Sequence, residues 1–273
     1  CQIMAGFIDA HSHLYAEEFS EDLDSVIQKA KENGVDGALV VTETTEDFEK
    51  VLQLTEKYSG FCLPCMGIHP VQGSPSGDAR SVRPADFDAA LPLIEKHHEK
   101  LVALGEVGLD FTPYHCKTDE DKEGQRQVLR NFVDLSKKYD LPLNVHSRSA
   151  GRPTINLLRE AGAEKVLLHA FDGKVSVAMS GVEAGYFFSV PPSVVRSEQK
   201  QKLIAKIPLE NLCLETDSPA LGPEKQVRNE PSNIRISCEH IAKIKKLDVE
   251  TVLQATRNNT LRLFPRIKNY IKL

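Results

Sequence analysis

The amino-acid sequence lacks several features that define particular classes of protein. It has no tryptophan, 6% aromatic residues and no apolar run of the ~18 residues that a membrane span needs. It contains neither a glycine-rich dinucleotide-binding motif nor a Walker-type phosphate loop. Its formal net charge of −5 argues against a basic surface for non-specific nucleic-acid binding, but leaves open a nucleic-acid substrate held in a metal-containing pocket. The first residues show no basic stretch before an apolar one, so we expect neither a secretory signal nor a membrane partner.

Cysteine is also scarce, and its placement argues against disulfides. The chain has six cysteines, several of them within apolar runs such as Leu212-Cys213-Leu214. This placement predicts reduced thiols and no disulfide-linked partner, as expected for an intracellular protein of the cytoplasm or nucleus. Cys62 and Cys65 have the spacing of a redox or zinc motif, but without a second such pair we interpret them as part of a buried strand. We expect a monomer.

Short apolar runs alternate with amphipathic stretches along the chain. We predict buried strands at residues 6–9, 37–42, 61–68, 101–105, 143–146, 166–169, 186–190 and 212–215. Helical patterns separate them, and Thr44-x-x-Asp47 and Thr118-x-x-Asp121 resemble capping boxes that open two helices. Strands that are apolar on both faces favour a parallel sheet, and eight such units in ~250 residues indicate an α/β fold of the (β/α)8 TIM-barrel class. We predict one domain over residues 1–273.

Two histidines stand one residue apart next to the first predicted strand. In an extended chain, residues i and i+2 point to the same side, so His11 and His13 would direct both imidazoles at one point. Neutral imidazole is the commonest metal ligand in proteins. Because such a pair also arises by chance, a metal site requires further ligands elsewhere in the chain.

Further polar residues stand at the ends of later predicted strands, namely Glu106, His146, His169 and Asp217. The carboxyl ends of the strands form the face on which barrel enzymes build their active sites. Four imidazoles and two carboxylates suffice for two metal ions that share a bridging group, and a carboxylate such as Glu106 is the natural bridge. We therefore expect two divalent cations, with Zn²⁺, Mn²⁺ or Fe²⁺ matching imidazole ligands better than Mg²⁺.

Seven segments resemble, in their order along the chain, the TatD family of metal-dependent deoxyribonucleases. They are residues 7–14 (FIDAHSHL), 67–70 (GIHP), 105–110 (GEVGLD), 146–148 (HSR), 169–171 (HAF), 215–219 (ETDSP) and 228–231 (RNEP). Within the family, residues 152–171 and 219–231 look most like the third human-type branch. The resemblance implies a metal-dependent phosphodiester hydrolase whose substrate is DNA or another nucleotide phosphodiester. Exonucleolytic cleavage, such as 3′–5′ removal of nucleotides, is common in the family.

The resemblance also implies a role for each site residue. The first metal ion would bind His11 and His13 with Asp217 close by, Glu106 would bridge, and the second ion would bind His146 and His169. A hydroxide formed between the two ions would attack phosphorus, with Asp217 orienting it or accepting its proton. His69 and Arg228 would contact phosphate oxygens, a role that suits the donor fork of arginine.

The sequence departs from the family pattern at two positions. Ser149 stands where the family commonly has an acidic residue, and Ala170 where cysteine or serine is frequent.

Two other functions are compatible with the sequence. One is an amidohydrolase-type lactonase or phosphotriesterase, although that class usually bridges its metals with a carbamylated lysine at the position of Glu106. The other is a protein that binds metal or nucleic acid without turnover.

Overall fold

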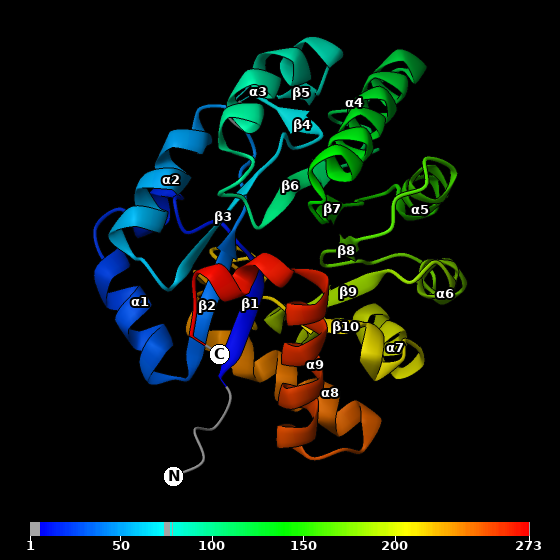
Figure 1. Ribbon diagram of the computed structural model, residues 1–273. Helices are drawn as coiled ribbons and strands as arrows, with labels where there is room; N and C mark the ends of the chain where they lie inside the picture. Colours follow the sequence, from blue (N-terminus) through cyan, green and yellow to red (C-terminus); the bar gives the residue numbers. More distant parts are fainter. Residues whose placement is uncertain (1–5, 74–76, 78, 273) are drawn as a thin grey trace.

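Eight parallel strands form a nearly closed barrel with helices on its outside (Figure 1). The computed structural model describes residues 6–73, 77 and 79–272. In spatial order the strands are β1 (Phe7–Ser12), β2 (Val35–Val40), β3 (Cys62–Met66), β6 (Ala103–Gly108), β7 (Leu143–His146), β8 (Val166–Leu168), β9 (Phe187–Val190) and β10 (Leu212–Leu214). The TIM-barrel prediction is confirmed. The assignment of residues 1–273 to one domain stays a prediction.

Nine helices of the described residues follow the strands, and one of the two predicted capping boxes opens its helix as expected. The helices are α1 (Leu23–Glu32), α2 (Asp47–Lys57), α3 (Pro84–His97), α4 (Asp119–Tyr139), α5 (Gly151–Glu160), α6 (Val175–Glu183), α7 (Glu198–Lys206), α8 (Ile234–Lys245) and α9 (Val249–Leu263). Thr118 and Asp121 form the predicted capping box at the start of α4. Thr44 also bonds Asp47, but α2 begins only at Asp47.

Several strand ends differ from the prediction. His11 lies within β1 and Glu106 within β6, rather than after them. These strands run on because their parallel neighbours continue beside them, with Ser12 paired to Val40 and Gly108 to His146. A short antiparallel pair, β4 (Val71–Gln72) and β5 (Arg80–Ser81), was not predicted.

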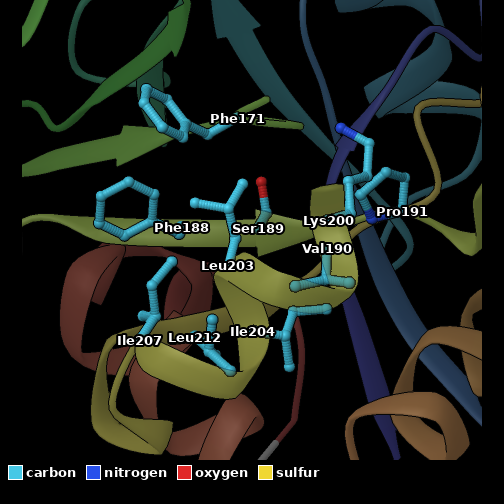
Figure 2. Close-up of a pocket in the computed structure, with 10 residues that line it drawn as sticks. All are labelled: Phe171, Phe188, Ser189, Val190, Pro191, Lys200, Leu203, Ile204, Ile207 and Leu212. Carbon is cyan, nitrogen blue, oxygen red and sulfur yellow. The ribbon is translucent and has the colours of Figure 1, made fainter. Parts of the chain in front are cut away.

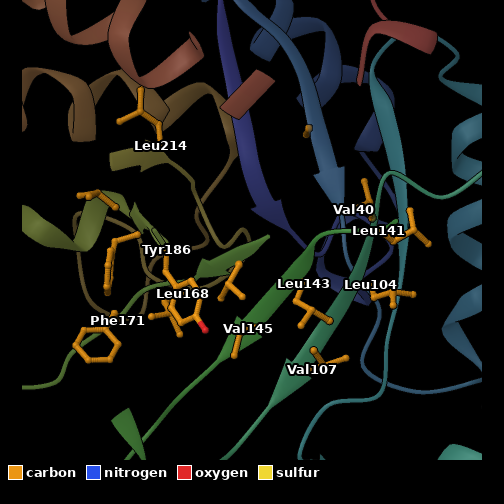
Figure 3. Close-up of a cluster of buried hydrophobic side chains, with 14 of the residues drawn as sticks. Val40, Leu104, Val107, Leu141, Leu143, Val145, Leu168, Phe171, Tyr186 and Leu214 are labelled. Carbon is orange, nitrogen blue, oxygen red and sulfur yellow. The ribbon is translucent and has the colours of Figure 1, made fainter. Parts of the chain in front are cut away.

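Alternate residues of each strand serve two apolar layers. Side chains such as Val107, Val145 and Leu168 face outward and pack between the barrel and its helices (Figure 3). A second cluster fills the inside of the barrel and ends in Leu263, Phe264, Ile267 and Ile271, which follow the last strand in sequence. The alternation also turns Asn144 and His146 inward, because Leu143 and Val145 of β7 belong to the outer layer.

The last segment closes the end of the barrel at which the strands begin. Arg266, in the 3₁₀ helix η5 (Pro265–Asn269), donates to the carbonyls of Leu101 and Tyr139, which precede β6 and β7. Tyr270 donates to the carbonyl of Lys100. The strand starts are thus covered by apolar residues, and we call Leu263, Phe264, Ile267 and Ile271 the floor.

The cysteines agree with the sequence-based expectation. The five that the structure describes are buried and free, whereas Cys1 lies outside the described residues. Cys62 belongs to the outer apolar layer and Cys65 to the inner one, so their thiols face opposite sides of β3 and cannot share a metal ion. Among the described residues, no helix is both long and apolar enough to cross a membrane.

Candidate metal centre

The six predicted ligands meet around the carboxylate of Glu106, at the end of the barrel where the strands finish. Oε2 of Glu106 lies 3.6 Å from Nε2 of His11 and 3.5 Å from Nε2 of His13. Oε1 lies 3.0 Å from Nε2 of His169 and 2.8 Å from Nδ1 of His146. Each carboxylate oxygen therefore faces its own pair of imidazole nitrogens, as a bridging carboxylate would.

Asp217 completes the side of the cluster that contains His11 and His13. Its Oδ1 lies 3.4 Å from Nε2 of His11 and 3.3 Å from Nε2 of His13. Its backbone is left-handed, with φ of +57°, a conformation that aspartate tolerates better than most residues. The Asp217 N–H donates to the carbonyl of His11 over 2.9 Å, which holds this turn against β1.

In the part of the chain that the structure describes, three groups of side chains place their ligand atoms close enough together to hold a metal ion. They are His11, His13 and Glu106; His11, His169 and Asp217; and His69, Glu106 and His146. The rings of His11 and His169 are stacked, with centroids 3.8 Å apart. His169 therefore borders both sides of the cluster, whereas the sequence-based hypothesis assigned it to the second ion alone.

Hydrogen bonds behind the cluster fix which ring nitrogens face it. The amide of Asn144 donates to the carbonyl of Ala10, so its oxygen accepts from Nδ1 of His11 over 2.8 Å. In the neutral ring, Nε2 of His11 then presents a lone pair to the cluster. The carboxylate of Asp110 accepts from Nε2 of His146 over 3.0 Å, which leaves Nδ1 of His146 to face Glu106. Lone pairs that converge on carboxylates fit a cation, and such outer hydrogen bonds are typical of metal-binding histidines.

The electrostatics of the cluster also demand positive charge. Burial raises the pKa of Glu106, but the surrounding imidazoles, those of His169 and His69 first, outweigh it and hold the pKa well below its ordinary range. Burial likewise opposes ionisation of Asp217, yet hydrogen bonds from His11 and His13 keep its pKa low. Burial lowers the pKa of His146, but its bonds to Asp110 and Glu106 raise the pKa by more, so that it lies at about 9. The two carboxylates thus stay ionised.

His69 lies beside Glu106, with 3.6 Å between Nε2 and Oε1. Its Nδ1 lies 3.0 Å from the nitrogen and 3.1 Å from the carbonyl oxygen of Val71, and the carboxylate of Glu106 beside Nε2 favours the neutral tautomer with the proton on Nε2. Burial lowers the pKa of His69, which favours that neutral form. In this tautomer His69 points a hydrogen-bond donor, rather than a lone pair, toward the cluster.

Arg228 is held by partners that lie outside the cluster. Its guanidinium forms a two-pronged ion pair with Asp22, at 2.8 and 2.6 Å, and also bonds Glu230. It lies over the ring of Phe19, 5.0 Å from the centroid. None of these partners belongs to the histidine–carboxylate cluster, so a phosphate contact by Arg228 stays a prediction.

Three buried residues near the cluster were not assigned a role from the sequence. Asn144 and Asp110 orient His11 and His146, and Oε2 of Glu215 lies 3.6 Å from Nδ1 of His169. Two of the three had a signal in their spacing: Asn144 stands two residues before His146 on one strand, and Glu215 two residues before Asp217. A cleft of about 530 Å³ opens beside the cluster, with Ser149 and Ala170 among its lining residues.

A parallel (β/α)8 barrel with buried histidines and carboxylates at its strand ends defines a class, that of metal-dependent hydrolases. The model of the family described as TatD related DNase matches residues 8–265. The chain belongs to this family.

Relatives and solved structures agree with this assignment. The chain is 59% identical to human "Deoxyribonuclease TATDN3" over 98% of its own length and 97% of the relative's. It is 33% identical to the "Uncharacterized metal-dependent hydrolase YabD" of Bacillus subtilis, over 94% of this chain and 98% of that one. The crystal structure of the TatD homologue YjjV from Escherichia coli superposes with a TM-score of 0.83 at 28% identity, over 96% of this chain and 99% of the other. An uncharacterised amidohydrolase from Saccharomyces cerevisiae, at 17% identity and a TM-score of 0.79, shares the fold.

Proposed function

We propose that this protein hydrolyses phosphodiester bonds of DNA with two divalent cations. The observation that carries the proposal is the position of Glu106, whose two oxygens face separate sets of ligand nitrogens. His11, His13 and Asp217 would hold one cation and His146 and His169 the other, with Glu106 shared between them. The printed name of the human relative, a deoxyribonuclease, supports DNA as the substrate.

The protein's own residues supply proton transfer and positioning. Bound divalent cations would contribute Lewis acidity, which lowers the pKa of water and offsets negative charge on phosphate. Asp217 stays ionised at neutral pH, so its carboxylate can orient an attacking water and accept its proton. His69 would offer its Nε2–H as a donor to a non-bridging phosphate oxygen.

Two other functions would require different features of the chain. An amidohydrolase-type lactonase would share the barrel, and it would use a carbamylated lysine where this chain has Glu106. A protein that binds metal or nucleic acid without turnover would not need Asp217. Oδ1 of Asp217 nevertheless lies within 3.4 Å of Nε2 of His11 and of His13, in a left-handed turn. The ligand set is complete, so hydrolysis is the function that it supports best.

The test compares three substrates on protein loaded with Zn²⁺, Mn²⁺ or Mg²⁺. We expect cleavage of end-labelled single-stranded DNA and of a p-nitrophenyl phosphodiester, no cleavage of a lactone, and loss of both activities in Asp217→Asn. Labels at the 5′ and 3′ ends report the direction of exonucleolytic cleavage. Hydrolysis of the lactone alone would contradict the proposal, and binding of DNA without turnover under any metal would favour the binding protein.

The number of metal ions needs a separate measurement. Elemental analysis after dialysis is expected to give two ions per chain in the wild-type protein and fewer in Glu106→Gln, which has one neutral oxygen in place of the charged carboxylate. One ion per chain in the active protein would contradict the two-ion proposal. The monomeric state and the intracellular location expected from the sequence remain predictions.

A further inference from the structure

The cleft beside the metal centre extends well beyond it. His146, His169 and Asp217 form one side of this space of about 530 Å³, and segments that follow β7, β8, β9 and β10 form the rest. Three cations, Arg148, Arg196 and Lys200, line that outer part. Apart from Asp217 of the metal centre, Asp172 is the acidic side chain among the described lining residues. The outer part of the cleft is therefore positively charged although the chain as a whole is acidic.

Lys200 is the buried member of this group. Its side chain lies in the first turn of α7 and is 8% exposed. Its Nζ donates to the carbonyl of Ala170 over 2.8 Å, and within the described residues it has no further hydrogen-bond partner. Figure 2 shows Lys200 at the rim of an apolar pocket, with its nitrogen turned away from Ile204 and Leu212. An ammonium group has three donors, so a buried one that uses a single donor calls for an additional acceptor.

Two further side chains of the 3₁₀ helix η2 (Pro192–Arg196) offer donors to the same cleft. Ser193 is 2% exposed, and its hydroxyl has no hydrogen-bond partner among the described residues. Arg196 is exposed and donates from Nε to the carbonyl of Gly222 over 3.2 Å. Its two terminal nitrogens have no partner in the described part of the chain. The hydroxyl of Ser193, the donors of Lys200 that Ala170 does not use and the terminal nitrogens of Arg196 thus border one space.

We propose that this part of the cleft binds a second phosphate group of the substrate, next to the one that is cleaved. The inference rests on the proposed function, because the cleft shares His146, His169 and Asp217 with the metal centre. A phosphate offers several acceptor oxygens at once, which matches the donors of Ser193, Arg196 and Lys200. The substrate is then a nucleotide chain that carries a phosphate on both sides of a nucleoside, rather than an isolated diester. The second phosphate is either a diester within the strand or a monoester at its end.

Binding of small nucleotides tests the subsite without turnover. The probes are thymidine 3′,5′-bisphosphate and the two thymidine monophosphates, titrated calorimetrically into metal-loaded protein. We expect wild-type protein to bind the bisphosphate about tenfold more tightly than either monophosphate, since a charge-assisted bond of ~1.4 kcal/mol corresponds to that factor. In Arg196→Ala and Lys200→Met this gain should fall to about twofold or less.

The matched control is Lys202→Met, which removes the same charge from an exposed position on α7, where Lys202 faces Glu198. It should keep the full gain. If Lys200→Met fails to fold, Arg196→Ala still decides, because Arg196 is exposed. Equal affinities for bisphosphate and monophosphates in wild-type protein would overturn the proposal, as would a full gain in both cleft variants.

A series of p-nitrophenyl esters distinguishes a second phosphate within a strand from one at its end. It also tests the phosphate subsite separately from the proposed hydrolase function. Thymidine 5′-(p-nitrophenyl phosphate) is compared with analogues that carry a 3′-phosphate or a 3′-linked nucleotide, and the isomeric series with 3′-(p-nitrophenyl phosphate) is run beside it. In one series the added group should raise kcat/KM, and Arg196→Ala should remove that increase. A gain from the linked nucleotide indicates a position within a strand, and a gain from the monoester alone indicates a strand end. If no ester releases p-nitrophenol while the bisphosphate gain persists, the proposed function fails and the phosphate subsite stands.

Discussion

The two ends of the barrel interior are built from the same strands and have opposite chemistry. Where the strands begin, the floor of Leu263, Phe264, Ile267 and Ile271 excludes water. Where they finish, the interior is filled by imidazoles and carboxylates. Both ends are buried, so burial alone does not distinguish the part that stabilises the fold from the part that carries the chemistry. The difference lies in the pairing of polar groups, because a buried ionised carboxylate persists only beside compensating charge.

The largest effect should come from removing the charge at the centre of the polar end. Glu106→Gln keeps the size of the side chain and removes its negative charge, so we expect turnover to fall on the order of 10³-fold or more. The floor is untouched, so far-ultraviolet circular dichroism and cooperative unfolding should be retained. Glu123→Gln, on the surface of α4, is the control and should keep normal turnover. Activity of Glu106→Gln near that of wild type would remove the basis for a bridging role.

The floor should respond in the opposite way. Phe264 is fully buried, so Phe264→Ala should lower the free energy of unfolding by ~3–5 kcal/mol. The folded fraction should bind as much metal as wild type, because the cluster lies at the other end of the barrel. Leu247→Ala, at a side chain 40% exposed, should cost much less and serves as the control in chemical denaturation. Loss of metal binding in folded Phe264→Ala would show that the two ends are coupled.

Only the polar end should respond to pH near neutrality. His146 has its pKa raised to about 9, because its bonds to Asp110 and Glu106 outweigh burial, which lowers it. Since a metal ion must displace this proton, we expect metal affinity to rise about tenfold per pH unit toward pH 9. In metal-free protein the proton's contribution to stability is full below the ordinary pKa of ~6.5 and is lost as pH rises through about 9. Competition with a chelator measures the first effect and thermal unfolding the second. A flat affinity over this range would contradict the assignment.

The smallest of these effects concerns the hydrogen bonds behind the ligands. Asn144→Ala removes the acceptor that orients His11, so metal affinity should fall ~10–100-fold, the range seen for outer-sphere residues. Asn131→Ala, whose side chain bonds Gln127 on the surface of α4, is the matched control. Unchanged affinity in Asn144→Ala would show that His11 keeps its orientation without this bond.

The convergence of the polar side chains could be predicted because it follows from the topology of the barrel. Parallel strands finish at one edge, so residues near the ends of identified strands, such as His11, Glu106, His146 and Asp217, are expected to lie close together. Strand limits were less accurate, since β1 and β6 extend through pairing with neighbours that are distant in sequence. The hydrophobic pattern records burial and not hydrogen-bond register.

Contacts between loops could not be predicted. Arg228 lies beside Asp22, 206 residues away, and no periodicity relates the two. His69 approaches Glu106 through the loop after β3, where the backbone of Val71 lies within hydrogen-bonding distance of its Nδ1. Asn144 and Asp110 stand inside segments that were recognised, but a ligand and the partner that orients it look alike in sequence. They are distinguished by the ring nitrogen that each one bonds: Asn144 bonds Nδ1 of His11 and Asp110 bonds Nε2 of His146, and both nitrogens point away from Glu106.

The position of the floor has a consequence for synthesis on the ribosome. Ile271 follows Leu214, the last residue of β10, by 57 residues. At ~5–20 residues per second, a nascent chain spends roughly 3–11 s with every barrel strand translated and the floor still incomplete. During that interval the inner apolar faces of the strands lack their cover and are open to chaperones or to other nascent chains.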